Sequence, residues 1–263
     1  MDLQLREKII LVTGGSKGLG LACAKLIALE GATVFIASRN EKHLRSAAAS
    51  IMKESGGTVS WFKCDVSKES EISSLASDIM KSNGGIDGMV INAGGPPPGG
   101  AITISEEDWR QALSQNLLSA VRLCKAFVPS MKERGGGRVV AITSVSAKQP
   151  IENLVLSNTT RLGVIGYLKT LAGEVGKDGI LINSVLPGPT LTGRLEGLLE
   201  DQARRQDRTV AAVKEERQQA IPVGRFGKPS ELAALVTFLI SSRNSYITGQ
   251  AIAVDGGYVQ FPL

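Results

Sequence analysis

The chain of 263 residues is 43% hydrophobic and 21% charged, which is typical of a globular protein with a sizeable core. Its formal charge of +5 comes from scattered Lys and Arg, which argues against a nucleic-acid-binding surface. A charged N-terminus, the lack of an apolar run of about 18 residues, and the unrelated spacing of Cys23, Cys64 and Cys124 argue against secretion, a membrane span and a metal site. We therefore expect a cytoplasmic protein without a metal.

Short β-rich segments alternate with amphipathic segments along the chain. Strands are predicted at residues 9–13, 32–38, 58–63, 88–91, 138–143 and 180–185. Helices are predicted at residues 18–30, 41–54, 69–81, 109–134 and 153–175. Buried strands separated by helices pair in parallel through right-handed crossovers. The pattern predicts an α/β fold of the Rossmann type, a doubly wound parallel sheet of about seven strands with helices on both faces.

One polar segment interrupts this alternation. Residues 192–219 carry several Arg and Lys side chains and predict one or two exposed helices. The segment is either a solvated face or a lid over a pocket, because α/β enzymes often close with such insertions. We treat residues 1–263 as a single nucleotide-binding domain with a helical lid at about residues 190–222.

A glycine-rich turn joins the first predicted strand to the first helix. Its glycines let the backbone approach a diphosphate, and the helix N-terminus offers free N–H groups and a positive dipole end. In this position the turn predicts a dinucleotide site, although a glycine-rich turn without a ligand is the alternative. The predicted contacts are Gly14, Ser16, Lys17, Gly18, Leu19 and Gly20.

The tip of the second strand favours a phosphorylated ribose. An Asp or Glu here would bind the ribose 2′-hydroxyl of NAD, but this chain has Ser38 and Arg39 instead. Arg39 can bind a 2′-phosphate with its forked donors, and Lys17 adds a second cation in the turn. We expect NADP(H), unless Arg39 is only a surface residue.

These motifs, in this order, resemble the short-chain dehydrogenase/reductase family over nearly the whole chain. The resemblance implies that Asp65 and Val66 lie near the adenine, that Asn92, Ala93 and Gly94 follow the fourth strand against the cofactor, and that Ser144 is the catalytic serine. It also implies that Asn116 belongs to a water relay. The nicotinamide amide would be held by Pro187, Gly188, Thr190 and Thr192. Length and the segment 221–227 most resemble the 3-oxoacyl-acyl-carrier-protein reductases.

The chain departs from this family at its proton-transfer motif. The family has a Tyr thirteen residues after the catalytic Ser and a Lys four residues further on. Here those positions are Ser157 and Arg161, and the nearest tyrosine, Tyr167, lies ten residues beyond Ser157. No tyrosine is therefore expected to reach the reactive ring.

This substitution changes the expected chemistry. The tyrosine of the family is a proton donor because its ordinary pKa of about 10 is lowered by the neighbouring lysine. A serine is far less acidic, and arginine stays protonated, so Ser157 and Arg161 are poor acids. Arg161 could still hold the ribose and stabilise an oxyanion beside Ser144. Water relayed through Asn116, or Lys148, could supply the proton.

Three functions remain open at this point. The first is an NADP(H)-dependent oxidoreductase that acts on a small carbonyl or alcohol, including a 3-oxoacyl thioester. The second is an impaired enzyme that senses NADP(H) or serves as a partner subunit, and the third is a lyase or isomerase in the same pocket. The small residues Gly163, Gly166, Ala172 and Gly173 predict a homotetramer built on the helices 109–134 and 153–175. A basic residue for an acyl carrier protein, Arg134, is present, but Asp178 stands at the second basic position.

Overall fold

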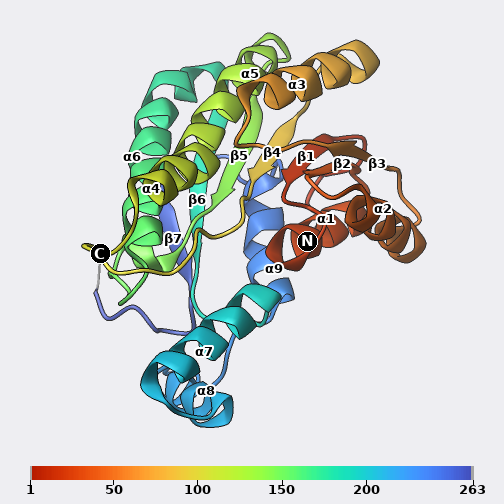
Figure 1. The fold of residues 1–263 in the computed structure, drawn as a ribbon. Helices are drawn as coiled ribbons and strands as arrows, with labels where there is room; N and C mark the ends of the chain where they lie inside the picture. The colour runs from red at the N-terminus through yellow and green to blue at the C-terminus, as the bar shows by residue number, and fades with distance from the viewer. Residues whose placement is uncertain (1, 262–263) are drawn as a thin grey trace.

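Seven parallel strands form one sheet in the order β3-β2-β1-β4-β5-β6-β7 (Figure 1). The structure, a computed structural model, describes residues 2–261. The strands are β1 (Ile9–Thr13), β2 (Thr33–Ser38), β3 (Val59–Lys63), β4 (Gly88–Ile91), β5 (Gly137–Ile142), β6 (Ile180–Pro187) and β7 (Ala251–Val254). The doubly wound fold class is confirmed.

Helices connect the strands and cover both faces of the sheet. They are α1 (Gly18–Leu29), α2 (Glu41–Ser55), α3 (Glu69–Asn83), α4 (Glu106–Ala112), α5 (Ser119–Glu133), α6 (Val155–Val175), α7 (Gly193–Gln206), α8 (Val210–Gln219) and α9 (Pro229–Ile240), with the shorter turns η1 (Leu113–Leu118), η2 (Val145–Ala147) and η3 (Gly176–Asp178). Within residues 2–261, none of the helices combines the length and the apolar character that spanning a bilayer requires.

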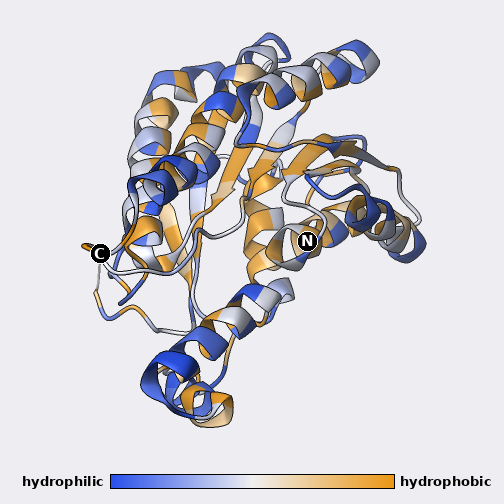
Figure 2. Ribbon diagram, viewed as in Figure 1, coloured by the Kyte–Doolittle hydropathy of each residue, from blue (hydrophilic) through white to orange (hydrophobic). Residues whose placement is uncertain are grey.

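The core has two layers, one on each face of the sheet. Helices α1, α2 and α9 bury their apolar side chains on one face, and α3, α5 and α6 bury theirs on the other. Most strand residues are buried, and the sheet is correspondingly apolar in Figure 2. Parallel strands that are covered on both faces have this continuous apolar character.

The single helix predicted at residues 109–134 is wrong in its start and in its continuity. Helix α4 begins at Glu106, after the N-cap Ser105, whose Oγ accepts a hydrogen bond from Asp108 N at 3.1 Å, and its first turn contains three acidic residues. A π-helical turn, η1, then separates α4 from α5. Apolar periodicity could not reveal this turn, because one wide turn barely changes the buried face.

The order of the strands opens a crevice at their carboxyl ends. The chain runs outward from β1 to β3 and then returns to β4 beside β1, so the connections after β1 and β4 diverge. Helices α7 and α8 project past the body of the sheet (Figure 1). Their own small core includes Leu195, Leu199, Val213 and Phe226, and Tyr258 packs against it.

Candidate functional site

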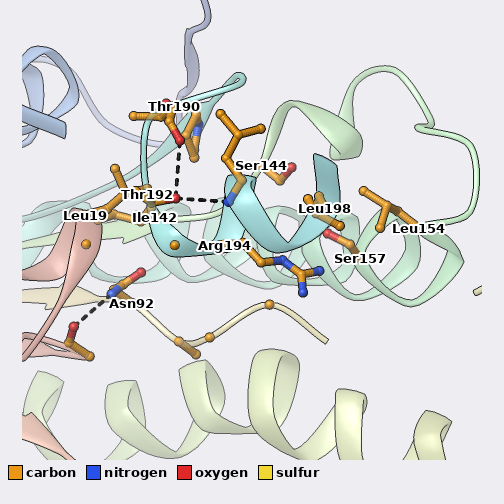
Figure 3. Close-up of a pocket in the computed structure, with 18 of the residues that line it drawn as sticks. Leu19, Asn92, Ile142, Ser144, Leu154, Ser157, Thr190, Thr192, Arg194 and Leu198 are labelled. Carbon is orange, nitrogen blue, oxygen red and sulfur yellow. Dashed lines mark hydrogen bonds between the residues drawn. The ribbon is translucent and has the colours of Figure 1, made fainter. Parts of the chain in front are cut away.

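A cavity of about 890 Å³ lies at the carboxyl ends of the strands. It extends from the turn after β1 to the start of α6 and is bordered by α7, and Figure 3 shows part of its lining. Most residues that the sequence predicts for the site line this one cavity. They are Gly14, Ser16, Lys17, Gly18, Leu19, Ser38, Arg39, Asp65, Val66, Asn92, Ala93, Gly94, Ser144, Ser157, Arg161, Pro187, Gly188, Thr190 and Thr192.

The glycine turn is packed so closely at Gly14 and Gly20 that side chains could not replace these two glycines. Gly14 has a φ of +60°, and a Cβ there would lie 2.6 Å from Asn92 Nδ2. A Cβ at Gly20 would lie 2.3 Å from Gly14 O. Gly20 does not line the cavity, so its part is to let α1 approach the turn. Helix α1 begins without a side-chain cap, which leaves its first N–H groups available to an anion.

Asn92 ties the turn to the loop after β4. Thr13 Oγ1 donates to Asn92 O and accepts from Asn92 N, both at 2.9 Å. Asn92 Nδ2 donates to Gly14 O at 3.3 Å. These hydrogen bonds join the carboxyl ends of β1 and β4 and so fix the backbone that lines this part of the cavity.

The far end of the cavity is basic and contains an unpaired hydroxyl. Ser38 Oγ is buried and has no hydrogen-bond partner within residues 2–261. Lys17 and Arg39 line the same region, and Asp65 is the carboxylate among its neighbours. Asp65 Oδ1 already accepts bonds from Ser67 N and Ser67 Oγ. A ligand with a polar, anionic group would satisfy Ser38 and neutralise the two cations.

Three serines meet at the opposite end. Ser144 ends the loop after β5, and its Oγ accepts from Ser146 N at 3.1 Å. Ser157 is buried in the first turn of α6, and its Oγ lies 3.2 Å from Ser146 Oγ. Ser157 therefore takes part in a short hydroxyl chain with Ser146, a residue that the sequence analysis did not single out.

Arg161 is a buried cation one helical turn beyond Ser157. Its side chain is only 7% exposed. Its guanidinium donates to Ile142 O at 3.2 Å and to Ala93 O at 3.1 Å, which places it between the ends of β4 and β5. Burial and, secondarily, the charge of Arg194 lower the pKa of Arg161 to about 10. Arg161 therefore remains positively charged near neutral pH.

Asn116 lies behind the cavity and is not part of its lining. It is buried in η1, where its Nδ2 donates to Thr160 Oγ1 at 3.2 Å and its Oδ1 has no partner within residues 2–261. The unpartnered oxygen is a free acceptor, as a water relay through Asn116 would need. Lys148, the other suggested proton source, is likewise not among the lining residues.

Further residues of the site were not predicted from the sequence. Tyr258 lines the cavity from the side of α7 and α8, against which it packs, and the expectation that no tyrosine reaches the reactive ring stays a prediction. Tyr167 instead lies in the core beside Cys124, and burial raises its pKa. His43 is half-buried and also lines the cavity.

Arg194 was missed as well, and it joins α7 to the rest of the site. Arg194 lies in the first turn of α7 and lines the cavity. Its Nη2 donates to Pro96 O, in the loop after β4, at 2.6 Å. Figure 3 shows its side chain extending from α7 toward that loop. The sequence placed Arg194 in a charged run that is typical of a solvated face, and only its position after the Pro-Gly segment could have signalled a role.

Within residues 2–261, no cluster of His, Cys, Asp and Glu has the grouping that a metal ion needs.

A family model described as enoyl-(acyl carrier protein) reductase matches residues 14–259. Dehydrogenase/reductase SDR family member 4 of Oryctolagus cuniculus is 35% identical over 254 residues, which span 96% of this chain and 94% of that protein.

Two further comparisons extend this likeness. The 3-oxoacyl-acyl-carrier-protein reductase of Chlamydia muridarum is 35% identical over 257 residues, which span 98% of this chain and 99% of that protein. L-sorbose reductase from Gluconobacter frateurii, solved in complex with NADPH and L-sorbose, has a TM-score of 0.94 at 32% identity and covers 99% of this chain and 100% of that one. The similarity therefore includes the whole sheet and helices α7 and α8.

Proposed function

Because this chain belongs to the short-chain dehydrogenase/reductase family, we propose that it is an NADP(H)-dependent oxidoreductase of carbonyl compounds with an altered proton-transfer apparatus. The observation that carries the proposal is the continuity of one cavity, which joins the glycine turn to Ser144 and Arg161. We treat the chain as one nucleotide-binding domain, with residues 190–222 as its lid. We place it in the cytoplasm, where its three unpaired, buried cysteines would stay reduced.

The residues present fit a phosphorylated dinucleotide. The uncapped N-terminus of α1 would hold the diphosphate, and Lys17, Ser38 and Arg39 would hold the 2′-phosphate. L-Sorbose reductase, which shares the fold of this chain, was solved with NADPH. NADPH supplies a hydride to the carbonyl carbon when it is bound. The chain must then position the carbonyl and stabilise the charge that develops on its oxygen.

Ser144 and Arg161 are the groups that can stabilise this oxygen. The Ser144 hydroxyl can donate a hydrogen bond, and Arg161 is a fixed cation held by two carbonyl groups. Ser157 is bonded to Ser146 and is too weak an acid to donate the proton. We assign the proton to water and the guanidinium to charge stabilisation. Loss of a positioned acid typically lowers turnover by about 10²- to 10⁴-fold, so we expect a slow enzyme.

The test restores the proton-transfer pair. NADPH oxidation would be followed with ketones and 3-oxoacyl thioesters for the wild type, for the double variant Ser157→Tyr/Arg161→Lys, and for Tyr258→Phe. We expect slow turnover in the wild type, at least a tenfold gain in the double variant, and a change of less than about twofold in Tyr258→Phe. A large loss in Tyr258→Phe would instead identify that phenol as the proton donor.

The second candidate function is a cofactor-binding protein without turnover. It is favoured by the replacement of both proton-transfer residues by Ser157 and Arg161 while the glycine turn is intact. Both candidate functions assume that NADP(H) binds, and thermal shift with NADPH and NADH tests this cofactor assignment. A larger shift with NADPH but no turnover in the wild type or the double variant would support the sensor. Equal or absent shifts would contradict the cofactor assignment itself.

A further inference from the structure

Two guanidinium groups, Arg161 and Arg194, line the same cavity, and neither has a carboxylate partner within residues 2–261. Arg161 is buried, and Arg194 is close enough for its charge to lower the pKa of Arg161. Neither forms an ion pair with a carboxylate of residues 2–261, and the groups that accept their hydrogen bonds are the backbone carbonyls of Ile142, Ala93 and Pro96. A buried charge beside a like charge is costly unless an anion arrives to neutralise both.

Other arginines of the lid, unlike Arg161 and Arg194, form ion pairs with carboxylates. Arg205 bonds Asp201 at 3.0 Å, and Arg208 pairs with Glu216. The cavity lining also contains Glu152, which is exposed and pairs with no cation of the described chain. The carboxylates that line the cavity therefore do not neutralise the charges of Arg161 and Arg194.

The position of the two arginines separates them from the expected diphosphate site. The diphosphate belongs at the glycine turn, where a Cβ on Gly18 would lie 3.7 Å from the Thr192 side chain. Arg194 follows two residues later but extends away from the turn, to Pro96 O. Arg161 lies one helical turn from Ser157, at the end where the carbonyl must be held. The uncompensated charge thus sits on the substrate side.

We propose that Arg161 and Arg194 together bind an anionic group of the substrate, so that the protein acts on small oxo-carboxylates in preference to neutral ketones. The proposal rests on the reductase function proposed above and names its substrate class. Arg161 has five N–H donors and uses two on backbone carbonyls, so donors remain for a ligand. A carboxylate matches two guanidinium forks in shape and charge. Arg194 also belongs to the lid, so the same anion would favour the closed lid.

The first measurement compares matched acids and esters. The 2-, 3- and 4-oxo isomers of pentanoate and their methyl esters would be reduced with NADPH by the wild type, Arg194→Gln, Arg194→Lys and the exposed control Arg110→Gln. We expect the wild type and Arg110→Gln to prefer one acid over its ester by about 10- to 100-fold in kcat/KM. Arg194→Gln should lose this preference mainly through KM, and Arg194→Lys should retain part of it.

The second measurement needs no turnover. Thermal shift in the presence of NADP⁺ would compare the same acids and esters, and NADPH affinity would be measured for each variant. We expect at least one acid to stabilise the wild type more than its ester and to lose that effect in Arg194→Gln, with NADPH affinity unchanged. This result without any turnover would contradict the reductase and leave the anion site standing.

Two results would overturn the anion site. The first is that acids and esters are bound and reduced equally, or that no acid stabilises the wild type. The second is that Arg194→Gln weakens NADPH binding about as much as it weakens the acids, which would assign the guanidinium to the diphosphate of the cofactor.

Discussion

Arg161 is a buried cation at the end of the cavity that also contains Ser144 and Ser157. Burial disfavours the charge of its guanidinium, and backbone carbonyls rather than a carboxylate accept its hydrogen bonds. Residues kept in such costly states commonly serve function rather than stability. A lysine, as the family has, would place a compact charge there, whereas the guanidinium spreads its charge over a planar fork.

The charge of Arg161 gives the reaction a defined pH dependence. Because burial and Arg194 lower its pKa to about 10, the cation is complete below that pH and is lost as the pH rises through it. We expect kcat/KM for reduction, measured from pH 7 to 11, to fall with a midpoint near 10. In Arg161→Lys the midpoint should move lower, because lysine has a lower ordinary pKa and the same burial lowers it further. Identical profiles for both proteins would assign the midpoint to another group.

Single residues could be predicted from the sequence where a motif fixed their distance along the chain. Ser144 and Arg161 lie seventeen positions apart, after a strand end and on the following long helix, and both line the cavity. Arg194 and Tyr258 could not be predicted, because their approach depends on how α7 and α8 pack against the rest of the chain. Tyr258 follows β7 at the opposite end of the chain from the glycine turn, and no local spacing relates the two.

At the scale of the element, α1 depends on a close approach to the turn that precedes it. We expect Gly20→Ala to lower NADPH affinity at least tenfold and to lower Tm, because its Cβ would lie 2.3 Å from Gly14 O and 2.7 Å from Asn92 Nδ2. Fluorescence titration and thermal unfolding would measure the two effects.

The matched control is Gly197→Ala in the middle of α7, where a Cβ would meet no atom within 4 Å. This substitution should leave NADPH affinity unchanged and raise Tm slightly, because alanine favours the helix. An unchanged affinity in Gly20→Ala as well would show that the turn tolerates displacement of α1.

Most element boundaries could be predicted because apolar strands end at glycines or caps. The strand at residues 9–13 and the strand at residues 88–91 match β1 and β4 residue for residue. The start of α4 was missed because its first turn is acidic and exposed, so hydrophobic periodicity began only at Trp109. Strand β7 and helix α9 were not delimited, since glycine signals surround them on both sides.

At the scale of the whole molecule, the predicted homotetramer needs a helical face that its own chain leaves uncovered. Ala172, expected at that interface, is wrong for the role, because it is buried against its own sheet. A Cβ on Gly163 would lie 3.3 Å from Leu117 of the same chain. Gly166 and Gly173 remain exposed on α6, together with Leu162, which is 56% exposed.

We expect Gly166→Arg to dissociate the assembly without unfolding the chain, because a Cβ there meets no atom of its own chain within 4 Å. Light scattering after size exclusion would give the mass, and circular dichroism would verify the fold. Gly197→Arg adds the same charge on α7 and should leave the mass unchanged. A monomeric wild type, or a tetramer that tolerates Gly166→Arg, would refute the α6 interface.

The three cysteines lie in separate parts of this molecule, in α1, after β3 and in α5. Burial raises the pKa of each thiol to about 12, so almost none is ionised at neutral pH. An alkylating reagent can then attack only when the surrounding layer opens. The order in which Cys23, Cys64 and Cys124 become labelled would therefore show which of the two core layers opens first.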